Sequence, residues 1–180
     1  MTALVINFLG GPGAGKSSLA LGVSSRLKYA GVNCEYIHEF AKELTWDKRF
    51  SAMKNQTWIL GSQYEMLRRC ANQVDVIITD TSLLNSVLYG QHLPFGDKIS
   101  ELAVTMFNSM ENMTFVVDRK KEYNPTGRSQ SEEESLVLDQ EVRDFLNSQP
   151  IKYYAVAGDI TGEGVVLERI KAHLKNPYPF

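Results

Sequence analysis

The chain carries the sequence GGPGAGKS at residues 10–17, which fits the phosphate-loop pattern G-x-x-x-x-G-K-[ST]. An apolar run, LVINFL at residues 4–9, precedes the motif, and Leu19, Val23 and Leu27 follow it at helical spacing. A strand, a glycine-rich turn and a helix are therefore expected in this order. This order is typical of a loop whose main-chain amides bind phosphate at the N-terminus of a helix.

The motif predicts the parts of a nucleoside triphosphate site. The Lys16 ammonium is expected to reach the β- and γ-phosphates, and the Ser17 hydroxyl is expected to bind Mg²⁺. Glycine permits the backbone turns that point successive N–H groups inward, and the positive end of the helix adds to the attraction. The expected nucleotide-binding residues are Gly11, Gly13, Ala14, Gly15, Lys16, Ser17 and Ser18.

Length and composition are those of an ordinary globular chain. The 180 residues, 43% of them hydrophobic, suit one domain over residues 1–180. The net charge of −2 gives no overall attraction to nucleic acid, so such a partner would need a local basic patch. Cys34 and Cys70 lack metal-ligand spacing, and neither a signal-like N-terminus nor a run of about 18 apolar residues is present. We expect a cytoplasmic protein with free thiols and no membrane partner; homodimerisation stays open.

Apolar segments alternate with helical patterns along the chain. The segments suited to strands are residues 3–9, 33–38, 74–79, 113–117 and 151–157. This alternation predicts an α/β fold, a three-layer α/β/α sandwich around a parallel sheet. Ser131 followed by Glu134 predicts a capping box at the start of a helix. The stretches that resist assignment, which we interpret as lids or binding loops, are residues 46–54, 90–96 and 119–130.

Two carboxylates follow predicted strands. Asp80 comes directly after the third strand, where a phosphate-loop protein places the acid that orders the magnesium shell; a helix N-cap is the alternative. Glu39 closes the second strand and is expected in the same cleft, because the carboxyl ends of parallel strands share one edge. Glu39 would be a general base or hold a ribose hydroxyl, with Glu43 one turn on sharing its face. An acidic helix start is the alternative for Glu39.

The stretch after the fourth strand is rich in cations, among them Arg119, Lys120, Lys121 and Arg128. We interpret residues 119–131 as a mobile lid that closes on the triphosphate. Phosphoryl transfer depends on positioning and charge stabilisation, so Arg119 or Arg128 would bind the transferring group and help exclude water. A surface loop with solvated charges is the alternative.

Gln56 and Gln63 lie seven residues apart on one predicted helix, next to its apolar stripe. Both side chains would edge the cleft and hydrogen-bond a base or sugar, or they would only mark the polar boundary of the stripe. Trp46, Trp58 and Tyr64 are aromatic candidates for stacking on a base or for packing in the core.

Taken together, these residues resemble the P-loop kinases of the nicotinamide riboside kinase type, which include the kinase domain of the bacterial NadR protein and small phage and bacterial kinases. The segments that carry the resemblance are the phosphate loop, EFAKE at 39–43 (compare E-Y-x-R-E), GSQ at 61–63, DT at 80–81 and GRS at 127–129. The resemblance implies a five-stranded sheet of order 2-3-1-4-5, ATP as donor with Mg²⁺, and a nucleoside-like acceptor.

By the same resemblance, Glu39 would be the base and Asp80 would lie on the metal side, as in the similar deoxynucleoside kinases. The sequence departs from the pattern at two positions. Lys42 stands where the pattern prefers Arg, which replaces a bidentate fork with a point charge. Thr81 stands where nucleoside and thymidylate kinases tend to carry Arg.

The function expected from the sequence is an ATP-dependent kinase that phosphorylates a nucleoside or a nucleoside monophosphate. Two alternatives remain: a nucleotide-dependent switch or NTPase that acts with a protein or nucleic-acid partner, and a kinase whose acceptor lies within DNA or RNA. The expected catalytic residues are Lys16, Glu39, Asp80, Arg119 and Arg128. The expected substrate-binding residues are Glu39, Lys42, Glu43, Gln56 and Gln63.

Overall fold

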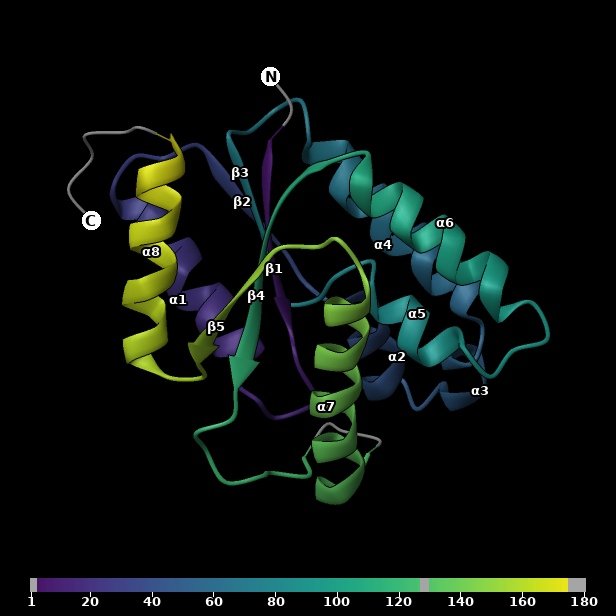
Figure 1. Cartoon of the computed structure of the whole chain (residues 1–180). Coiled ribbons are helices and arrows are strands. Elements are labelled where there is room, and N and C mark those ends of the chain that lie inside the picture. The colour runs from purple at the N-terminus through teal and green to yellow at the C-terminus, as the bar shows by residue number, and fades with distance from the viewer. Residues whose placement is uncertain (1–2, 127–129, 175–180) are drawn as a thin grey trace.

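The structure, a computed structural model, describes residues 3–126 and 130–174 (Figure 1). The strands within these residues are β1 (Leu4–Leu9), β2 (Cys34–Ile37), β3 (Val76–Thr79), β4 (Glu111–Asp118) and β5 (Tyr153–Ala157). The helices are α1 (Lys16–Tyr29), α2 (Phe40–Trp46), α3 (Phe50–Met53), α4 (Gln56–Cys70), α5 (Asn85–Gly90), α6 (Gly96–Asn108), α7 (Glu132–Ser148) and α8 (Ile160–Leu174). Each of the five expected strands is confirmed, with ends that differ by at most two residues.

The five strands form one sheet in the order β2-β3-β1-β4-β5, and all neighbouring strands are parallel. This is the order 2-3-1-4-5 that the sequence predicted. The carboxyl ends of β1, β2 and β3 therefore meet at one edge of the sheet, which brings the phosphate loop, Glu39 and Asp80 close together.

Helices cover both faces of the sheet, which confirms the three-layer α/β/α sandwich. Figure 1 shows α1 and α8 on one face and α4, α5, α6 and α7 on the other. Successive side chains of a strand point to opposite faces. Accordingly, Leu4, Ile6 and Phe8 of β1 pack in the core cluster under α1 and α8, and Val5 and Leu9 pack in the other cluster.

Several smaller expectations have clear outcomes. The capping box is confirmed, since the Glu134 N–H donates to Ser131 Oγ (3.2 Å) and the Ser131 N–H donates to Glu134 Oε2 (2.7 Å). Both Cys34 and Cys70 are free thiols. The stretch 46–54 contains the short helix α3, whereas the described part of 119–131 forms no helix or strand. Among the helices of residues 3–126 and 130–174, none is long and apolar enough to cross a membrane.

Gly158, directly after β5, is in close backbone contact with the phosphate loop. Its N–H donates to the Asp118 carbonyl at 2.8 Å. A Cβ atom at Gly158 would lie 1.9 Å from the Ala14 carbonyl oxygen, and one at Gly15 would lie 2.6 Å from the Gly158 oxygen. The φ of Gly15, +110°, is also one that favours glycine. The phosphate loop and the turn after β5 are therefore packed too closely for any side chain.

We predict that Gly158→Ala destabilises the fold by about 1–3 kcal/mol, because the added methyl group must displace the phosphate loop or the turn. Urea unfolding measures this loss. Gly164→Ala is the matched control, because a Cβ at Gly164 in α8 meets no atom within 4 Å. The control is expected to be unchanged or more stable by about 0.4–1 kcal/mol. Equal unfolding midpoints for Gly158→Ala and the wild type would contradict the close contact.

Candidate functional site

The phosphate loop joins β1 to α1 and leaves main-chain amides open to a ligand. Gly10, Gly13 and Gly15 have positive φ values, as the glycine-rich pattern predicts. No side chain caps the N-terminus of α1. The first amides of a helix have no partner within the helix, so an uncapped N-terminus attracts an anion. The loop is therefore shaped to receive phosphate.

Lys16 lies inside this loop. Its Nζ donates hydrogen bonds to the carbonyl oxygens of Gly10 (2.7 Å) and Gly11 (3.0 Å). Burial lowers the pKa of the Lys16 ammonium, while the carboxylates of Glu39 and Asp80 act in the opposite direction. The ammonium is thus held at the loop, next to two acids, in a setting where a phosphate would compensate its charge.

Asp80, immediately after β3, connects the phosphate loop to the end of β2. Its side chain is only 1% exposed. Ser17 Oγ donates to Asp80 Oδ2 at 2.5 Å, and the Glu39 N–H donates to Asp80 Oδ1 at 2.9 Å. A hydroxyl and a carboxylate in contact are hard oxygen ligands of the kind that Mg²⁺ prefers, and Mg²⁺ takes its other ligands from phosphates and water. The residues present fit this ion.

Glu39 stands at the N-cap of α2, with an extended backbone (φ −68°, ψ 118°). Burial raises the pKa of its carboxyl group, and the nearby Asp80 acts in the same direction, while Lys16 and Lys42 act against it. Gln63 of α4 fixes this turn, because its Oε1 accepts from the Phe40 N–H (2.9 Å) and its Nε2 donates to the His38 carbonyl (3.2 Å). Glu39 is therefore held rigidly beside Lys16.

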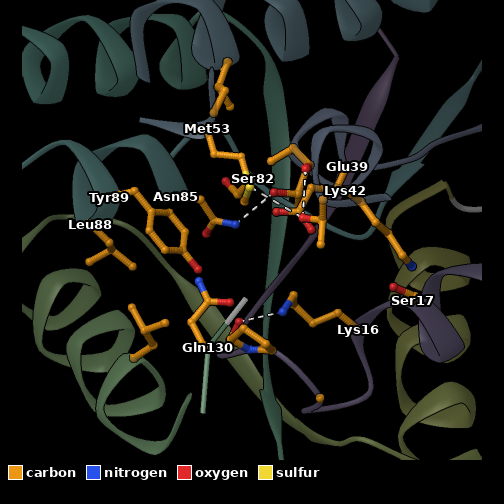
Figure 2. Close-up of a pocket in the computed structure, with 18 of the residues that line it drawn as sticks. Lys16, Ser17, Glu39, Lys42, Met53, Ser82, Asn85, Leu88, Tyr89 and Gln130 are labelled. Carbon is orange, nitrogen blue, oxygen red and sulfur yellow. Dashed lines mark hydrogen bonds between the residues drawn. The ribbon is translucent and has the colours of Figure 1, made fainter. Parts of the chain in front are cut away.

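A single cavity of about 850 Å³ extends from the phosphate loop into the space between α2, α3, α4, α5 and α7. Figure 2 shows Lys16, Glu39 and two residues of α5, Asn85 and Tyr89, around this cavity. Its far wall is largely apolar or aromatic, with Trp46, Phe50, Met53, Ile59, Leu88, Leu93, Leu138 and Val142. A site with this shape can hold a nucleotide tail at one end and a second molecule at the other.

Two polar side chains of α5 mark the second half of the cavity. Asn85 Nδ2 donates to Thr81 Oγ1 at 2.8 Å, which leaves Asn85 Oδ1 as an acceptor for a ligand (Figure 2). Tyr89 lines the same cavity while 38% of the residue stays exposed, and its phenol hydroxyl is a hydrogen-bond donor for a ligand. These groups would orient a polar ligand among apolar walls.

The structure brings most of the predicted site residues together. The predicted residues that line the cavity are Gly13, Gly15, Lys16, Ser17, Ser18, Glu39, Lys42, Gln56 and Gln63, with Asp80 in contact with Ser17. The two glutamines have structural contacts that the sequence did not suggest. Both ends of the Gln63 amide bind backbone groups, and Gln56 Nε2 donates to the Met53 carbonyl at 2.8 Å.

The expectation that Glu43 shares the cleft with Glu39 is wrong. Glu43 is exposed, contacts His38 Nε2 at 2.5 Å and does not line the cavity. The physical reason is the N-cap position of Glu39, whose extended backbone removes the helical i, i+4 relation on which the expectation rested.

The expectation for Arg119 also needs correction. Its guanidinium does not line the cavity, because it binds Asp139 and the Pro12 carbonyl on the outer side of the phosphate loop.

Two of the amides expected to bind nucleotide already have partners. The Gly11 N–H donates to Asp139 Oδ1, and the Ala14 N–H donates to the Gly11 carbonyl (3.3 Å), so neither amide is free for phosphate. Arg128 lies outside the described residues.

The aromatic candidates separate into three roles. Trp46 is 62% exposed and lines the cavity, so it can contact a ligand. Trp58 packs edge-on against Phe40 with ring centroids 5.0 Å apart, and Tyr64 packs against the core. Stacking on a base is thus geometrically open to Trp46.

Sequence reasoning missed Tyr36, Asn85, Tyr89 and Asp139. The pKa of the Tyr36 phenol is raised by burial and then by the adjacent Asp80 carboxylate, which places the ring beside the metal-side acid. Asn85 and Tyr89 share one face of α5 at i, i+4 spacing, soon after the predicted strand end at Asp80. That spacing was a usable signal, whereas nothing in the local sequence indicates that Asp139 meets the phosphate loop.

Strand, phosphate loop, helix and the acid after β3 together define a P-loop nucleotide-binding protein. The sequence matches the family model described as "AAA domain" over residues 5–162, and the chain belongs to this family. A search of the curated proteins finds no match.

Two solved kinases resemble the structure distantly. A mutant of the APS kinase CysC from Mycobacterium tuberculosis has 17% identity and a TM-score of 0.43, with 81% of this chain and 98% of that chain covered. Shikimate kinase from Bacteroides thetaiotaomicron has 12% identity and a TM-score of 0.48, with 98% and 100% covered. Likenesses this distant indicate no substrate.

We predict that Glu39→Gln stabilises the protein without nucleotide or magnesium at neutral pH. Folding raises the pKa of Glu39 above its ordinary value of 4.5, so the unfolded chain loses the proton first and stability falls as the pH rises through this interval. Glutamine has no proton to lose in this pH range, so the variant keeps the stability that the wild type loses. Its advantage in urea unfolding is expected to grow as the pH rises from 4.5 and to level off above the raised pKa.

The control for this prediction is Glu35→Gln. It changes a partly exposed glutamate of β2, the strand that leads to Glu39, and this glutamate pairs with Lys28. It is expected to show no comparable rise with pH. A stability difference between Glu39→Gln and the wild type that stays constant at every pH would show that burial does not perturb Glu39.

Proposed function

We propose that this protein is an ATP-dependent kinase that transfers the γ-phosphoryl group to a nucleoside or nucleotide acceptor. The observation that carries the proposal is the position of Glu39, a half-buried carboxylate that shares one cavity with Lys16 of the phosphate loop. A protein that only hydrolyses nucleotide needs room for a water molecule there. This cavity instead continues into an apolar chamber large enough for a second organic molecule.

In the proposed reaction, the residues of this chain position two substrates and receive one proton. The amides of Gly13 and of residues 15–18, together with the Lys16 ammonium, hold the triphosphate, and Ser17 and Asp80 are the residues that would hold Mg²⁺. Mg²⁺, when bound, neutralises charge on the β- and γ-phosphates. The acceptor oxygen forms a bond to the γ-phosphorus, the bond to the β–γ bridging oxygen breaks, and ADP leaves. Glu39 accepts the proton of the acceptor hydroxyl.

The charges around Glu39 favour a hydroxyl over a phosphate as the acceptor group. Two carboxyl groups, the half-buried Glu39 and the buried Asp80, lie close together here, and Lys16 already contacts two carbonyl oxygens of the loop. A dianionic phosphate next to two carboxylates would meet repulsion, whereas a neutral hydroxyl needs the acceptor that a carboxylate supplies. Asn85 and Tyr89 would then orient the rest of the acceptor.

The kinase proposal is tested by incubating the protein with Mg-ATP and a panel of nucleosides and nucleoside monophosphates, with products separated by chromatography. We expect a phosphorylated nucleoside from at least one member of the panel. Glu39→Gln is expected to lower kcat by about 10²–10⁴-fold, because it removes the proton acceptor. Glu35→Gln, in β2 four residues before Glu39 and outside the cavity, is expected to retain wild-type kcat.

Two results would contradict the proposal. The first is ATP hydrolysis at the same rate with and without every acceptor, with stimulation by DNA or a protein instead. The second is an unchanged kcat for Glu39→Gln on the accepted substrate.

A further inference from the structure

The outer side of the phosphate loop is held by side chains from α7 and from the residue that follows β4. Asp139 Oδ1 accepts a hydrogen bond from the Gly11 N–H at 2.5 Å. Ser135, which is fully buried, donates from Oγ to the Pro12 carbonyl at 2.5 Å. The N–H of Gly11 and the carbonyl of Pro12, groups of two neighbouring loop residues, are therefore both bound by side chains of one helix.

Arg119 completes this contact. Its Nη1 donates to the Pro12 carbonyl at 2.9 Å, and its Nη2 donates to Ser135 Oγ at 2.6 Å. Its Nε and Nη2 also donate to Asp139 Oδ2, at 3.2 and 2.9 Å. The Arg119 and Asp139 side chains are only 12% and 21% exposed, so this ion pair is largely shielded from water. We call Arg119, Ser135 and Asp139 the loop clasp.

The loop clasp sets which groups of the loop face the nucleotide. An anion site needs amides that converge on the anion and carbonyl oxygens that point away from it. The clasp gives the Pro12 carbonyl two hydrogen-bond donors and gives the Gly11 N–H a carboxylate acceptor. A Cβ at Gly11 would lie 2.2 Å from the Ser135 carbonyl oxygen, so α7 and the loop are also in direct steric contact.

We propose that Arg119, Ser135 and Asp139 are positioning residues for nucleotide binding, which hold the phosphate loop in its anion-binding shape. The inference rests on the part of the proposed function in which the loop binds Mg-ATP, and it is independent of the acceptor. It gives Arg119 a role different from charge stabilisation during transfer. Arg119, at the start of the segment 119–131, and Ser135, in the first turn of α7 after it, both donate to the Pro12 carbonyl.

The chain offers a closely matched control. Arg143 of α7 binds Asp118, the last residue of β4, so this ion pair joins the same helix to the same strand end. Neither residue contacts the phosphate loop through its side chain in the described hydrogen bonds. Loss of the Asp118–Arg143 pair weakens the docking of α7, whereas loss of Asp139 weakens both the docking and the loop.

The test compares Asp139→Asn and Asp118→Asn by calorimetric titration with Mg-ATP and by steady-state kinetics. Asp139→Asn is expected to raise the Kd and the KM for ATP about tenfold, as for loss of a charge-assisted hydrogen bond, with little change in kcat at saturating ATP. Asp118→Asn is expected to keep the wild-type Kd, although its melting temperature falls. Arg119→Ala is expected to follow Asp139→Asn in raising the KM for ATP.

The possible outcomes are distinguishable. Equal ATP affinity for Asp139→Asn and Asp118→Asn, weakened or not, would overturn the inference, as would a loss of kcat at saturating ATP in Arg119→Ala. If Asp139→Asn does not fold, Ser135→Ala takes its place, and wild-type ATP affinity in that variant overturns the inference. Failure of the wild type to bind Mg-ATP overturns the proposed function and this inference together.

Discussion

The site depends on one buried carboxylate, that of Asp80, which has hydrogen-bond partners in two different parts of the molecule. A buried charge is costly unless it is paired or hydrogen-bonded. Ser17 of the phosphate loop satisfies one oxygen and the main chain of Glu39 satisfies the other. The same contacts fix the distance between the nucleotide half and the acceptor half of the cavity. The end of β3 therefore holds the two halves of the site together.

Much of the fold could be predicted from the sequence, because its signals are local. Apolar runs at fixed places predicted the strands, and the phosphate-loop pattern predicted the order of β1, loop and α1. The sheet order came from the resemblance to P-loop kinases and is confirmed by the strand pairing. The sequence did not predict the short helix α3 or the contacts of the 119–131 segment, because neither stretch has an apolar periodicity that would set it apart from a loop.

The sequence predicted the site correctly for those residues whose location is set by the main chain. Lys16, Ser17, Glu39 and Asp80 all lie at ends of strands or in the loop, and parallel topology alone brings them together. Glu43 and Arg119 were misplaced because their positions depend on side-chain direction and on partners far away in the sequence. Arg119 lies outside the cavity because it pairs with Asp139, a residue twenty positions later. No local pattern indicates that Asp139 contacts Gly11.

The central claim is that Asp80 and Ser17 form the metal side of a nucleotide site, and calorimetric titration with ATP in the presence and absence of Mg²⁺ tests it most directly. For the wild type the account predicts saturable ATP binding that Mg²⁺ strengthens. For Asp80→Asn, confirmed as folded by circular dichroism, it predicts that the strengthening by Mg²⁺ is lost. ATP binding by the wild type that is indifferent to Mg²⁺, or full Mg²⁺ dependence in Asp80→Asn, would contradict the account.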